Sequence, residues 1–263
     1  MIFRTLFFVF VFIPFLVVVI PLQFLVNALH LKSWQVLPRA FHRLGCVFLG
    51  LRVQVIGQPA TGRPTLLVSN HISWTDIIAV GSVADVTFVA KREVGQWPFV
   101  GMMARLQKTI FVDRNRRSDA GRTSREMGAH MAGGNAVLLF AEGQSDIGTH
   151  VLPFRSALVG AAQHAMIEAG ATDVVIQPLT IAYTRLGGLP IGRNERSRVA
   201  WIKSKSLKQN IAEILGSPTK DVTIVFGAPI ALGQGDNRKA VASAAEQQVR
   251  KALVALNRGK ARR

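Results

Sequence analysis

The pattern of apolar and polar positions divides this chain into a short N-terminal segment and a long remainder. Residues 5–31 contain no Asp, Glu, Lys or Arg and are rich in Phe, Val, Ile and Leu. A helix of this length crosses the ~30 Å hydrocarbon core of a bilayer. Pro14 and Pro21 interrupt the run, so a kinked span and a bent hairpin held in one leaflet both stay open. The run is longer than the core of a secretory signal and no A-x-A-like site follows it, so we expect residues 1–31 to be a retained membrane anchor.

The remainder, residues 32–263, alternates between short apolar runs and amphipathic stretches. The short runs predict strands at residues 53–56, 65–69, 86–90, 108–112, 136–140, 174–183 and 221–226. The amphipathic stretches predict a helix that begins near Asp76 and further helices at residues 97–106, 118–131, 153–169 and 238–256. This alternation predicts an α/β fold, a mixed sheet covered by helices, in one domain. Pro178 lies inside one predicted strand, which favours an edge position or a bulge for that strand.

A histidine and an aspartate lie five positions apart where the strand at residues 65–69 should lead into a helix. Residues 73–76 have the S-x-x-D form of a capping box, which places Asp76 in the first turn and His71 just before it. A carboxylate on one ring nitrogen would fix the tautomer and leave the other nitrogen free to take a proton from a hydroxyl. The alternative is that Asp76 only caps the helix and His71 is an ordinary loop residue.

Two other predicted strands end in residues that can bind a ligand. Arg114 opens a basic cluster after the strand at residues 108–112, and forked guanidinium groups bind phosphate or carboxylate. Glu142 follows the strand at residues 136–140, and Gly143 after it lets the backbone approach a ligand closely. A solvated basic turn and an ordinary acidic turn are the alternatives for these two segments.

The charge balance is strongly basic, with 32 Lys and Arg against 15 Asp and Glu, and a net charge of +17. Such a balance fits either nucleic acid or an anionic membrane surface. One Tyr and one Cys leave no aromatic RNA-binding pattern and no zinc-finger spacing, so beside an anchor we expect a lipid surface and no nucleic acid. Four cations without an intervening acid follow the anchor, which places the domain on the cytoplasmic side of the membrane: Lys32, Arg39, Arg43 and Arg52.

Four short segments together resemble the glycerolipid acyltransferases of the 1-acylglycerol-3-phosphate acyltransferase group. The Asn-His-x4-Asp block of that family is matched at residues 70–76, its Phe-hydrophobic-Asp-Arg block at residues 111–114, and its proline-containing strand at residues 176–179. The family's Phe-Pro-Glu-Gly-Thr-Arg-Ser block is matched only in part at residues 140–143. The resemblance covers roughly residues 30–230, and the family's N-terminal membrane element fits residues 5–31.

The resemblance implies an O-acyltransferase in which His71 is the general base and Asp76 orients its ring. The acyl donor would be acyl-CoA or acyl-carrier protein and the acceptor a lysolipid, first of all 1-acyl-sn-glycerol-3-phosphate. The residues expected to bind substrate are Arg114, Glu142, Gly143 and Arg155. We expect no metal and no cofactor besides the acyl donor, since no H-E-x-x-H spacing occurs.

One departure from the family pattern bears on the acceptor. Where the family has an arginine that helps to hold the acceptor's phosphate, this chain has Ser145. A related branch acylates lyso-ornithine lipid, which has a hydroxyl but no phosphate, and this acceptor is the main alternative. A membrane-anchored hydrolase and a basic, non-catalytic membrane scaffold are further alternatives, although the chain has no G-x-S-x-G sequence.

Overall fold

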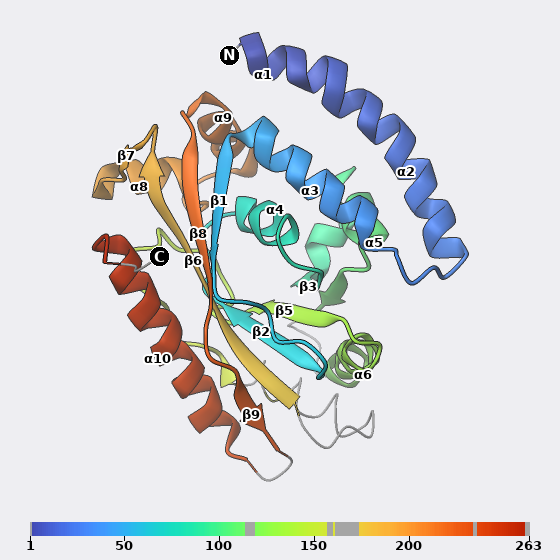
Figure 1. The fold of residues 1–263 in the computed structure, drawn as a ribbon, viewed down its shortest axis with the longest axis vertical. Coiled ribbons are helices and arrows are strands. Elements are labelled where there is room, and N and C mark those ends of the chain that lie inside the picture. The colour runs from blue at the N-terminus through green and yellow to red at the C-terminus, as the bar shows by residue number, and fades with distance from the viewer. Residues whose placement is uncertain (1, 114–118, 157–159, 161–173, 234–235, 261–263) are drawn as a thin grey trace.

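The computed structural model describes residues 2–113, 119–156, 160, 174–233 and 236–260. Within these residues, nine strands form one mixed sheet (Figure 1). The strands are β1 (Leu51–Ile56), β2 (Thr65–Ser69), β3 (Val86–Lys91), β4 (Ile110–Val112), β5 (Ala136–Phe140), β6 (Val174–Leu186), β7 (Leu189–Pro190), β8 (Lys220–Phe226) and β9 (Ile230–Leu232). Their order is β1-β8-β6-β2-β5-β3-β4, and β7 and β9 pair with β6. Strands β6, β2, β5, β3 and β4 are mutually parallel, whereas β8 runs antiparallel to β6.

Helices cover both faces of this sheet. They are α1 (Ile2–Phe7), the π-helical segment η1 (Phe8–Phe12), α2 (Ile13–Ala28), α3 (Val36–Leu49), α4 (Thr75–Gly81), the 3₁₀ segment η2 (Arg92–Gln96), α5 (Val100–Leu106), α6 (Asp119–Ala132), α8 (Arg193–Val199), α9 (Leu207–Gly216) and α10 (Arg238–Asn257). Helices α3 and α4 lie on one side of the sheet and α10 on the other (Figure 1). The result is a three-layer α/β arrangement, as the alternating sequence pattern predicts.

Strand β2 shows why its sequence is apolar at successive positions. Leu67 packs into one hydrophobic cluster with residues of α4 and α9, whereas Leu66 and Val68 pack into a second cluster with residues of α6 and α10. All three side chains are fully buried. A parallel strand covered on both faces needs an apolar side chain on each, so period-two alternation disappears.

The observed elements confirm most of the predicted ones. Strands β2 and β5 have the predicted bounds, and the other predicted strands shift by one to three residues at one end or the other. The helix expected at residues 97–106 begins only at Val100, after the turn around Phe99. Most of the helix expected at residues 153–169 lies outside the described residues. Helices α3, α8 and α9 are additional to the predicted set.

The expected edge position of the strand that holds Pro178 is wrong, because β6 lies inside the sheet between β2 and β8. The alternative, a bulge in that strand, corresponds to a register shift against β8 between Tyr183 and Arg185. Pro178 falls between the residues of β6 that pair with β9 and those that pair with β8. Its carbonyl accepts the N–H of Gly227, which lies where the chain passes from β8 to β9. The missing proline N–H therefore faces a break in the partner strand, where no ladder bond is lost.

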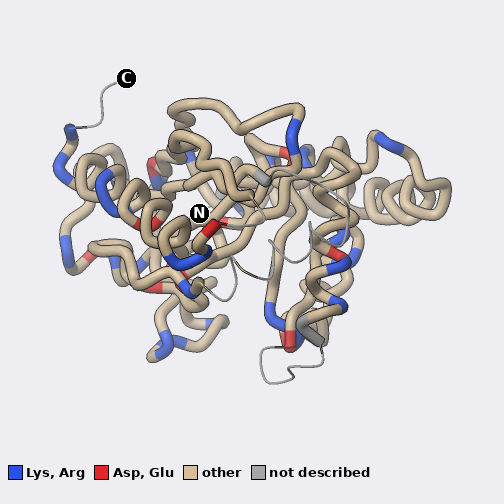
Figure 2. The backbone as a smooth tube through the Cα atoms, turned by 90° about the horizontal axis from the view of Figure 1, so that it is seen from below, with Lys and Arg blue, Asp and Glu red and all other residues tan. Residues whose placement is uncertain are grey.

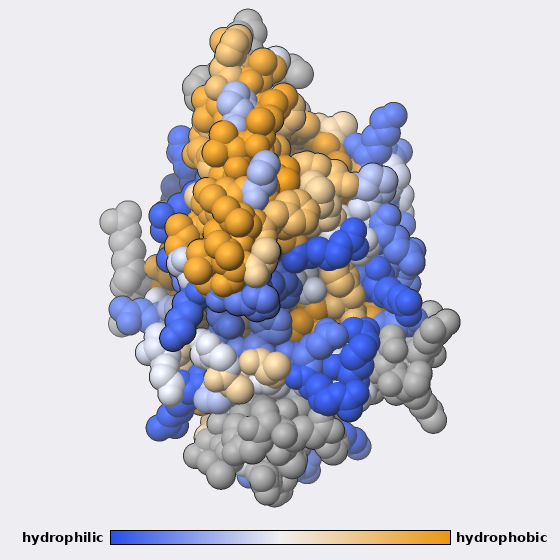
Figure 3. Space-filling view, turned by 90° about the vertical axis from the view of Figure 1, so that its right-hand side faces the viewer, coloured by the Kyte–Doolittle hydropathy of each residue, from blue (hydrophilic) through white to orange (hydrophobic). Residues whose placement is uncertain are grey.

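The N-terminal helices form one curved arm across the outside of α3 and α5 (Figure 1). The stretch Arg4–Ala28 is 25 residues long and is long and apolar enough to cross a membrane, by length and composition. Its exposed side chains give the apolar surface seen in Figure 3. The arm is nevertheless attached to the domain, since Arg4 Nη1 donates to the carbonyls of Leu215 at 2.6 Å and Ser217 at 2.9 Å.

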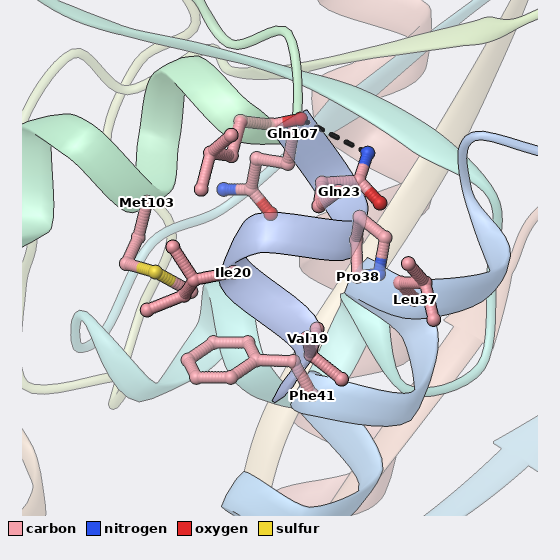
Figure 4. A pocket seen from close by; sticks show the side chains of 9 residues that line it. Val19, Ile20, Gln23, Leu37, Pro38, Phe41, Met103 and Gln107 are labelled. Atoms are coloured by element: carbon pink, nitrogen blue, oxygen red, sulfur yellow. Dashed lines mark hydrogen bonds between the residues drawn. The ribbon is translucent and has the colours of Figure 1, made fainter. Parts of the chain in front are cut away.

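The other end of the arm meets α5. Asn27 Nδ2 donates to the carbonyl of Leu106 at 2.8 Å, and Gln23 Nε2 donates to the same carbonyl at 3.3 Å. Between α2, α3 and α5 lies an open apolar groove whose empty volume, solvent included, is about 360 Å³. Figure 4 shows Ile20 and Met103 facing each other across it. Polar bonds at both ends and apolar contacts between them hold the arm alongside the domain.

Candidate active site

The predicted His–Asp pair is formed at the end of β2. His71 lies in the short connection between β2 and α4, and its Nδ1 lies 2.8 Å from Oδ2 of Asp76. The Asp76 side chain is fully buried, whereas that of His71 is 16% exposed. Because the Asp76 carboxylate can only accept a hydrogen bond, Nδ1 of His71 carries the proton and donates it. The lone pair of Nε2 is therefore free. The described residues provide no hydrogen bond to Nε2, so this atom is available to a substrate.

Asp76 is held by four donors. Its Oδ2 accepts the backbone N–H groups of Ile72 at 2.7 Å and Ser73 at 3.0 Å as well as His71 Nδ1. Its Oδ1 accepts the hydroxyl of Tyr183 at 2.8 Å. These bonds satisfy a buried charge that would otherwise be costly. They also fix the position at which the imidazole is held.

Only one of the two hydrogen bonds of the expected capping box is present. Asp76 accepts the N–H of Ser73, but the Ser73 hydroxyl is buried and makes no hydrogen bond to the described residues. The helix α4 begins at Thr75, after Trp74. The segment therefore directs its backbone donors to the carboxylate of Asp76, and Ser73 does not cap the helix.

Tyr183 is a site residue that the sequence analysis did not identify. It is the one tyrosine of the chain, lies on β6 and is fully buried. Its hydroxyl also lies 2.6 Å from Oγ1 of Thr75, which must donate because the tyrosine proton goes to Asp76. Burial raises the pKa of Tyr183 well above its ordinary value, and the charge of Asp76 raises it further. The phenol therefore stays protonated as a permanent donor to the carboxylate.

Phe140 forms one wall of the site. Its ring stacks on the imidazole of His71, with ring centroids 4.0 Å apart and planes 20° apart. Phe140 ends β5, which is parallel to β2, so both rings lie at the carboxyl edge of the sheet. An apolar ring on this face holds the imidazole in one orientation.

Glu142 holds the backbone of the segment that contains His71. Its Oε2 accepts the N–H of His71 at 2.7 Å, and its Oε1 accepts the N–H of Leu152 at 2.7 Å. Burial raises the pKa of Glu142 to about 8; the two backbone N–H groups oppose the shift, and the charges of Asp146 and Asp76 add to it. The sequence analysis expected Glu142 to bind the acceptor. In the structure both carboxylate oxygens of Glu142 already accept hydrogen bonds from backbone N–H groups.

Gly143 and Arg155 lie in the same connection after β5. Gly143 has φ of +75°, a conformation that favours glycine, and its N–H closes a turn onto the carbonyl of Phe140 at 3.1 Å. Arg155 donates its backbone N–H to the carbonyl of Ala141, and its side chain is exposed. Arg114 lies outside the described residues. Substrate contacts of these residues stay predictions.

Two loops close around His71. The N–H of Asp146 donates to the carbonyl of His71 at 2.9 Å, and the N–H of Trp201 donates to that of Ile72 at 3.0 Å. The Ser145 hydroxyl donates to the carbonyl of Trp201 and so joins the two loops. Ser145, at the position where the resemblance expected an arginine, is thus part of the loop structure beside His71.

Asp146 adds a third carboxylate next to His71. Its side chain is 23% exposed, and its Oδ2 is buried without a hydrogen bond from the described residues. Nδ1 of His150 lies 3.7 Å from this oxygen. The surroundings of His71 are thus locally acidic in a strongly basic protein. Among the described residues, no group of three or more His, Cys, Asp or Glu side chains is placed to hold a metal ion.

Comparison with known proteins agrees with the motif pattern. A family model described as "Acyltransferase" matches residues 52–182. The chain is 42% identical to a lyso-ornithine lipid O-acyltransferase of Brucella abortus over 89% of this chain and 88% of that protein. It is 36% identical to a 1-acyl-sn-glycerol-3-phosphate acyltransferase of Neisseria gonorrhoeae over 51% of this chain and 50% of that protein. Its fold is similar to the crystal structure of the 1-acyl-sn-glycerophosphate (LPA) acyltransferase PlsC from Thermotoga maritima, with a TM-score of 0.65 and 21% identity over 100% of this chain and 97% of that one.

Proposed function

Because this chain belongs to the acyltransferase family, we propose that it transfers a fatty acyl group to the free hydroxyl of a lysolipid, with His71 as the general base. The observation that carries this proposal is the geometry of His71. One ring nitrogen is held 2.8 Å from a buried carboxylate, and the other is free. This arrangement suits proton transfer from a hydroxyl at neutral pH.

The reaction then proceeds without a covalent acyl-enzyme. His71 Nε2 takes the proton of the acceptor hydroxyl as its oxygen attacks the thioester carbonyl of the donor, acyl-CoA or acyl-carrier protein. Asp76 stabilises the imidazolium that forms, and Tyr183 and the two backbone N–H groups hold Asp76 in place. The tetrahedral intermediate collapses to the new ester, and the departing thiolate takes the proton from the imidazolium.

For the acceptor, we propose lyso-ornithine lipid. The relative from Brucella abortus, matched over most of both chains, bears that name. The acidic surroundings of His71 also support this choice, since Asp76 and Asp146 would repel a phosphate and attract the amine of an ornithine headgroup. Asp146 is the carboxylate that we assign to this amine. The glycerol-phosphate acceptor, placed first by the sequence pattern, is the second candidate and is supported by the Neisseria gonorrhoeae relative and the exposed Arg155.

We further propose that the N-terminal arm attaches the enzyme to the cytoplasmic side of the membrane. Its attachment to the domain by Arg4 at one end and Gln23 and Asn27 at the other supports an arm that lies along one leaflet rather than a span that leaves the domain. Lys and Arg positions are distributed around the whole domain (Figure 2), which fits adsorption to anionic lipid.

An acceptor panel tests the reaction. Purified full-length protein is given lyso-ornithine lipid or 1-acylglycerol-3-phosphate with each acyl donor, and released thiol and diacyl lipid are measured together. We expect both products with lyso-ornithine lipid, and ~10²–10⁴-fold slower formation of both with the His71→Ala variant. Free fatty acid without diacyl lipid would indicate a hydrolase, and no released thiol with any pair would indicate a scaffold.

Asp146→Asn tests the headgroup assignment. A lost charge-assisted bond of ~1.5–3 kcal/mol raises the KM for lyso-ornithine lipid roughly ten- to a hundredfold. The KM for the acyl donor should stay near that of the wild type, because the proposed ligand of the Asp146 carboxylate is the acceptor and not the donor. An equal rise in both values would show that Asp146 acts through the loop structure and not on the headgroup.

A further inference from the structure

The turn between η2 and α5 holds an exposed phenylalanine in an unusual conformation. Phe99 has φ of +60° and ψ of −56°, and the N–H of Val100 donates to the carbonyl of Pro98 at 2.6 Å. These values define a classic γ-turn, which is rare and strained for a residue with a side chain. The side chains of Phe99 and Val100 are nevertheless 51% and 42% exposed. We call these two residues the apolar tip.

The base of this turn is rigidly held. The N–H of Gly101 donates to the carbonyl of Trp97 at 2.9 Å, and Arg105 Nη1 donates to the carbonyl of Gly95 at 2.6 Å. A Cβ atom on Gly101 would lie 2.3 Å from the Gly95 carbonyl oxygen, so α5 and η2 approach at the closest distance that backbones allow. Strain that the surrounding structure fixes in this way is found at functional positions.

Helix α5 connects the apolar tip to the N-terminal arm. Helix α5 extends from the tip to Leu106, whose carbonyl accepts hydrogen bonds from Gln23 and Asn27 of α2. Seven helical residues span about 10 Å, so the tip lies within that distance of α2 along α5. The apolar surface of the arm appears in Figure 3 with hydrophilic residues below it.

Cations lie on the elements that flank the apolar tip. Lys91 at the end of β3, Arg92 on η2 and Arg105 on α5 are exposed, as is Glu93 on η2, and Arg92 lies 3.5 Å from Asp113. An apolar projection between basic elements matches the boundary between acyl chains and anionic headgroups. Exposure of the tip to water would be unfavourable, because Phe99 and Val100 are adjacent large apolar side chains on a strained backbone.

We propose that the apolar tip, Phe99 and Val100, inserts into the lipid surface as a second membrane contact that belongs to the catalytic domain itself. The proposal rests on the membrane attachment proposed above and adds a site outside residues 1–31. Trp97, at the base of the turn, contacts Trp201 edge to face with centroids 6.0 Å apart. Trp201 in turn binds the carbonyl of Ile72, next to His71. Insertion of the tip would therefore hold the catalytic segment at the level where a lysolipid leaves the bilayer.

Environment-sensitive labels in the full chain test this inference. On a Cys46→Ala background, single cysteines replace Phe99, Val17 on the exposed face of α2, or Leu189 on the β7 turn, and each carries a nitrobenzoxadiazole label. Val17 and Leu189 are 68% and 72% exposed. The labelled proteins are mixed with vesicles of phosphatidylcholine and phosphatidylglycerol, with doxyl lipids as quenchers inside the bilayer and iodide as the quencher in water.

We expect the label at position 99 to shift to shorter wavelength and to be quenched by doxyl lipid, as at position 17, while position 189 is quenched by iodide alone. Iodide quenching at 99 with doxyl quenching at 17 would overturn the proposal and leave the N-terminal attachment intact. Loss of doxyl quenching at both positions would contradict the attachment itself. A blue shift at 99 without doxyl quenching, or one that needs added acyl-carrier protein, would overturn the proposal in favour of a protein partner.

A functional comparison adds a second readout. Phe99→Asp should raise the apparent KM for lysolipid embedded in vesicles by roughly tenfold, since a half-buried apolar contact with lipid is replaced by a charge. Its activity toward the same lysolipid dispersed in detergent micelles should match the wild type. Leu189→Asp is the matched control and should leave both activities unchanged. Equal losses in vesicles and in micelles, with an unchanged unfolding temperature, would contradict a role at the bilayer.

Discussion

At the scale of single residues, the site depends on how many donors each buried carboxylate receives. Asp76 accepts hydrogen bonds from His71, from two backbone N–H groups and from Tyr183. Glu142 accepts the backbone N–H groups of His71 and Leu152. His71 is thus fixed twice, through its ring by Asp76 and through its backbone by Glu142. This double attachment gives the imidazole one position relative to the sheet.

Replacing the base should separate chemistry from folding. His71→Ala removes the proton acceptor and should lower turnover by ~10²–10⁴-fold while the unfolding temperature in detergent changes little. Asp76→Asn should in addition lower the stability by ~1–3 kcal/mol, because an amide nitrogen cannot accept from the buried donors. Initial rates and thermal unfolding of both variants check the two statements. Near-normal turnover by folded His71→Ala protein would refute the assignment of the base.

The titration of Glu142 should appear in the pH dependence of stability. Burial raises its pKa from 4.5 to about 8, so the folded protein binds this proton more tightly than the unfolded chain does. The free energy of unfolding therefore falls as the pH rises from 4.5 to about 8. The protein is more stable at the low-pH end of this window, where Glu142 is protonated in the folded state. Glu142→Gln cannot titrate, so its stability relative to the wild type should rise across this window.

Unfolding temperatures of wild type and Glu142→Gln at several pH values measure this difference. Glu126→Gln, an exposed position on α6 that is paired with Arg122, is the control for general effects of pH. A difference between wild type and Glu142→Gln that stays constant, or moves in the other direction, would contradict the raised pKa of Glu142.

At the scale of elements, helix ends and close crossings fix the layers around the sheet. The buried ammonium of Lys220, on β8, donates to the carbonyls of Leu49 at 3.1 Å and Ile214 at 2.9 Å, at the carboxyl ends of α3 and α9. Burial lowers the pKa of Lys220 to about 8. Arg4 binds the same end of α9, so the first helix of the chain is attached to the same group of elements. Cations at helix carboxyl ends are favoured by the unpaired carbonyls there.

Gly101 tests the close crossing of α5 and η2. Gly101→Ala places a Cβ atom 2.3 Å from the carbonyl oxygen of Gly95, so the backbones must separate, at a cost of about 1–3 kcal/mol of stability. Gly121→Ala on α6, whose nearest neighbour is 3.8 Å away, should instead be neutral or stabilising by ~0.5–1 kcal/mol. Thermal unfolding in detergent compares the two. Equal stability of both variants would show that the crossing is not tight.

At the scale of the whole molecule, one side combines the apolar arm with a charged domain surface. The arm is exposed over residues such as Val17 and Val18, which are 68% and 64% accessible. It also covers carbonyls that would lose their partners if it were removed, at Leu106, Leu215 and Ser217. Deleting residues 1–31 would therefore release the protein from membranes and damage the domain together. Point substitutions on the exposed face avoid this.

Val17→Asp combined with Val18→Asp should weaken binding to vesicles by roughly tenfold or more, because two charges replace apolar contacts with lipid. The remaining basic surface should leave a salt-sensitive attachment, since exposed charges are screened over ~10 Å at 0.1 M salt. Flotation with vesicles at low and high salt measures both effects. Val254→Asp on α10 is the control and should bind as the wild type does; unchanged flotation of the double variant in high salt would place the anchor elsewhere.

Features that depend on near neighbours in the chain could be predicted from the amino-acid sequence. The bounds of β2 and β5 follow from uninterrupted apolar runs, and the His71–Asp76 pair follows from a five-residue spacing at a strand-to-helix junction. The apolar arm follows from a long stretch without charge. The acyltransferase assignment follows from the order of motifs that the family comparison confirms.

The distant residues that complete these features could be identified only from the folded arrangement of the strands. Tyr183 reaches Asp76 across 107 positions, and Glu142 reaches the backbone of His71 across 71, because β6 and β5 flank β2 in the sheet. Pro178 could be accommodated inside the sheet only because its partner strand changes beside it. Local sequence does not encode sheet order, which is set by how both faces of each strand are covered. The roles of these residues therefore became visible only once the strands were placed.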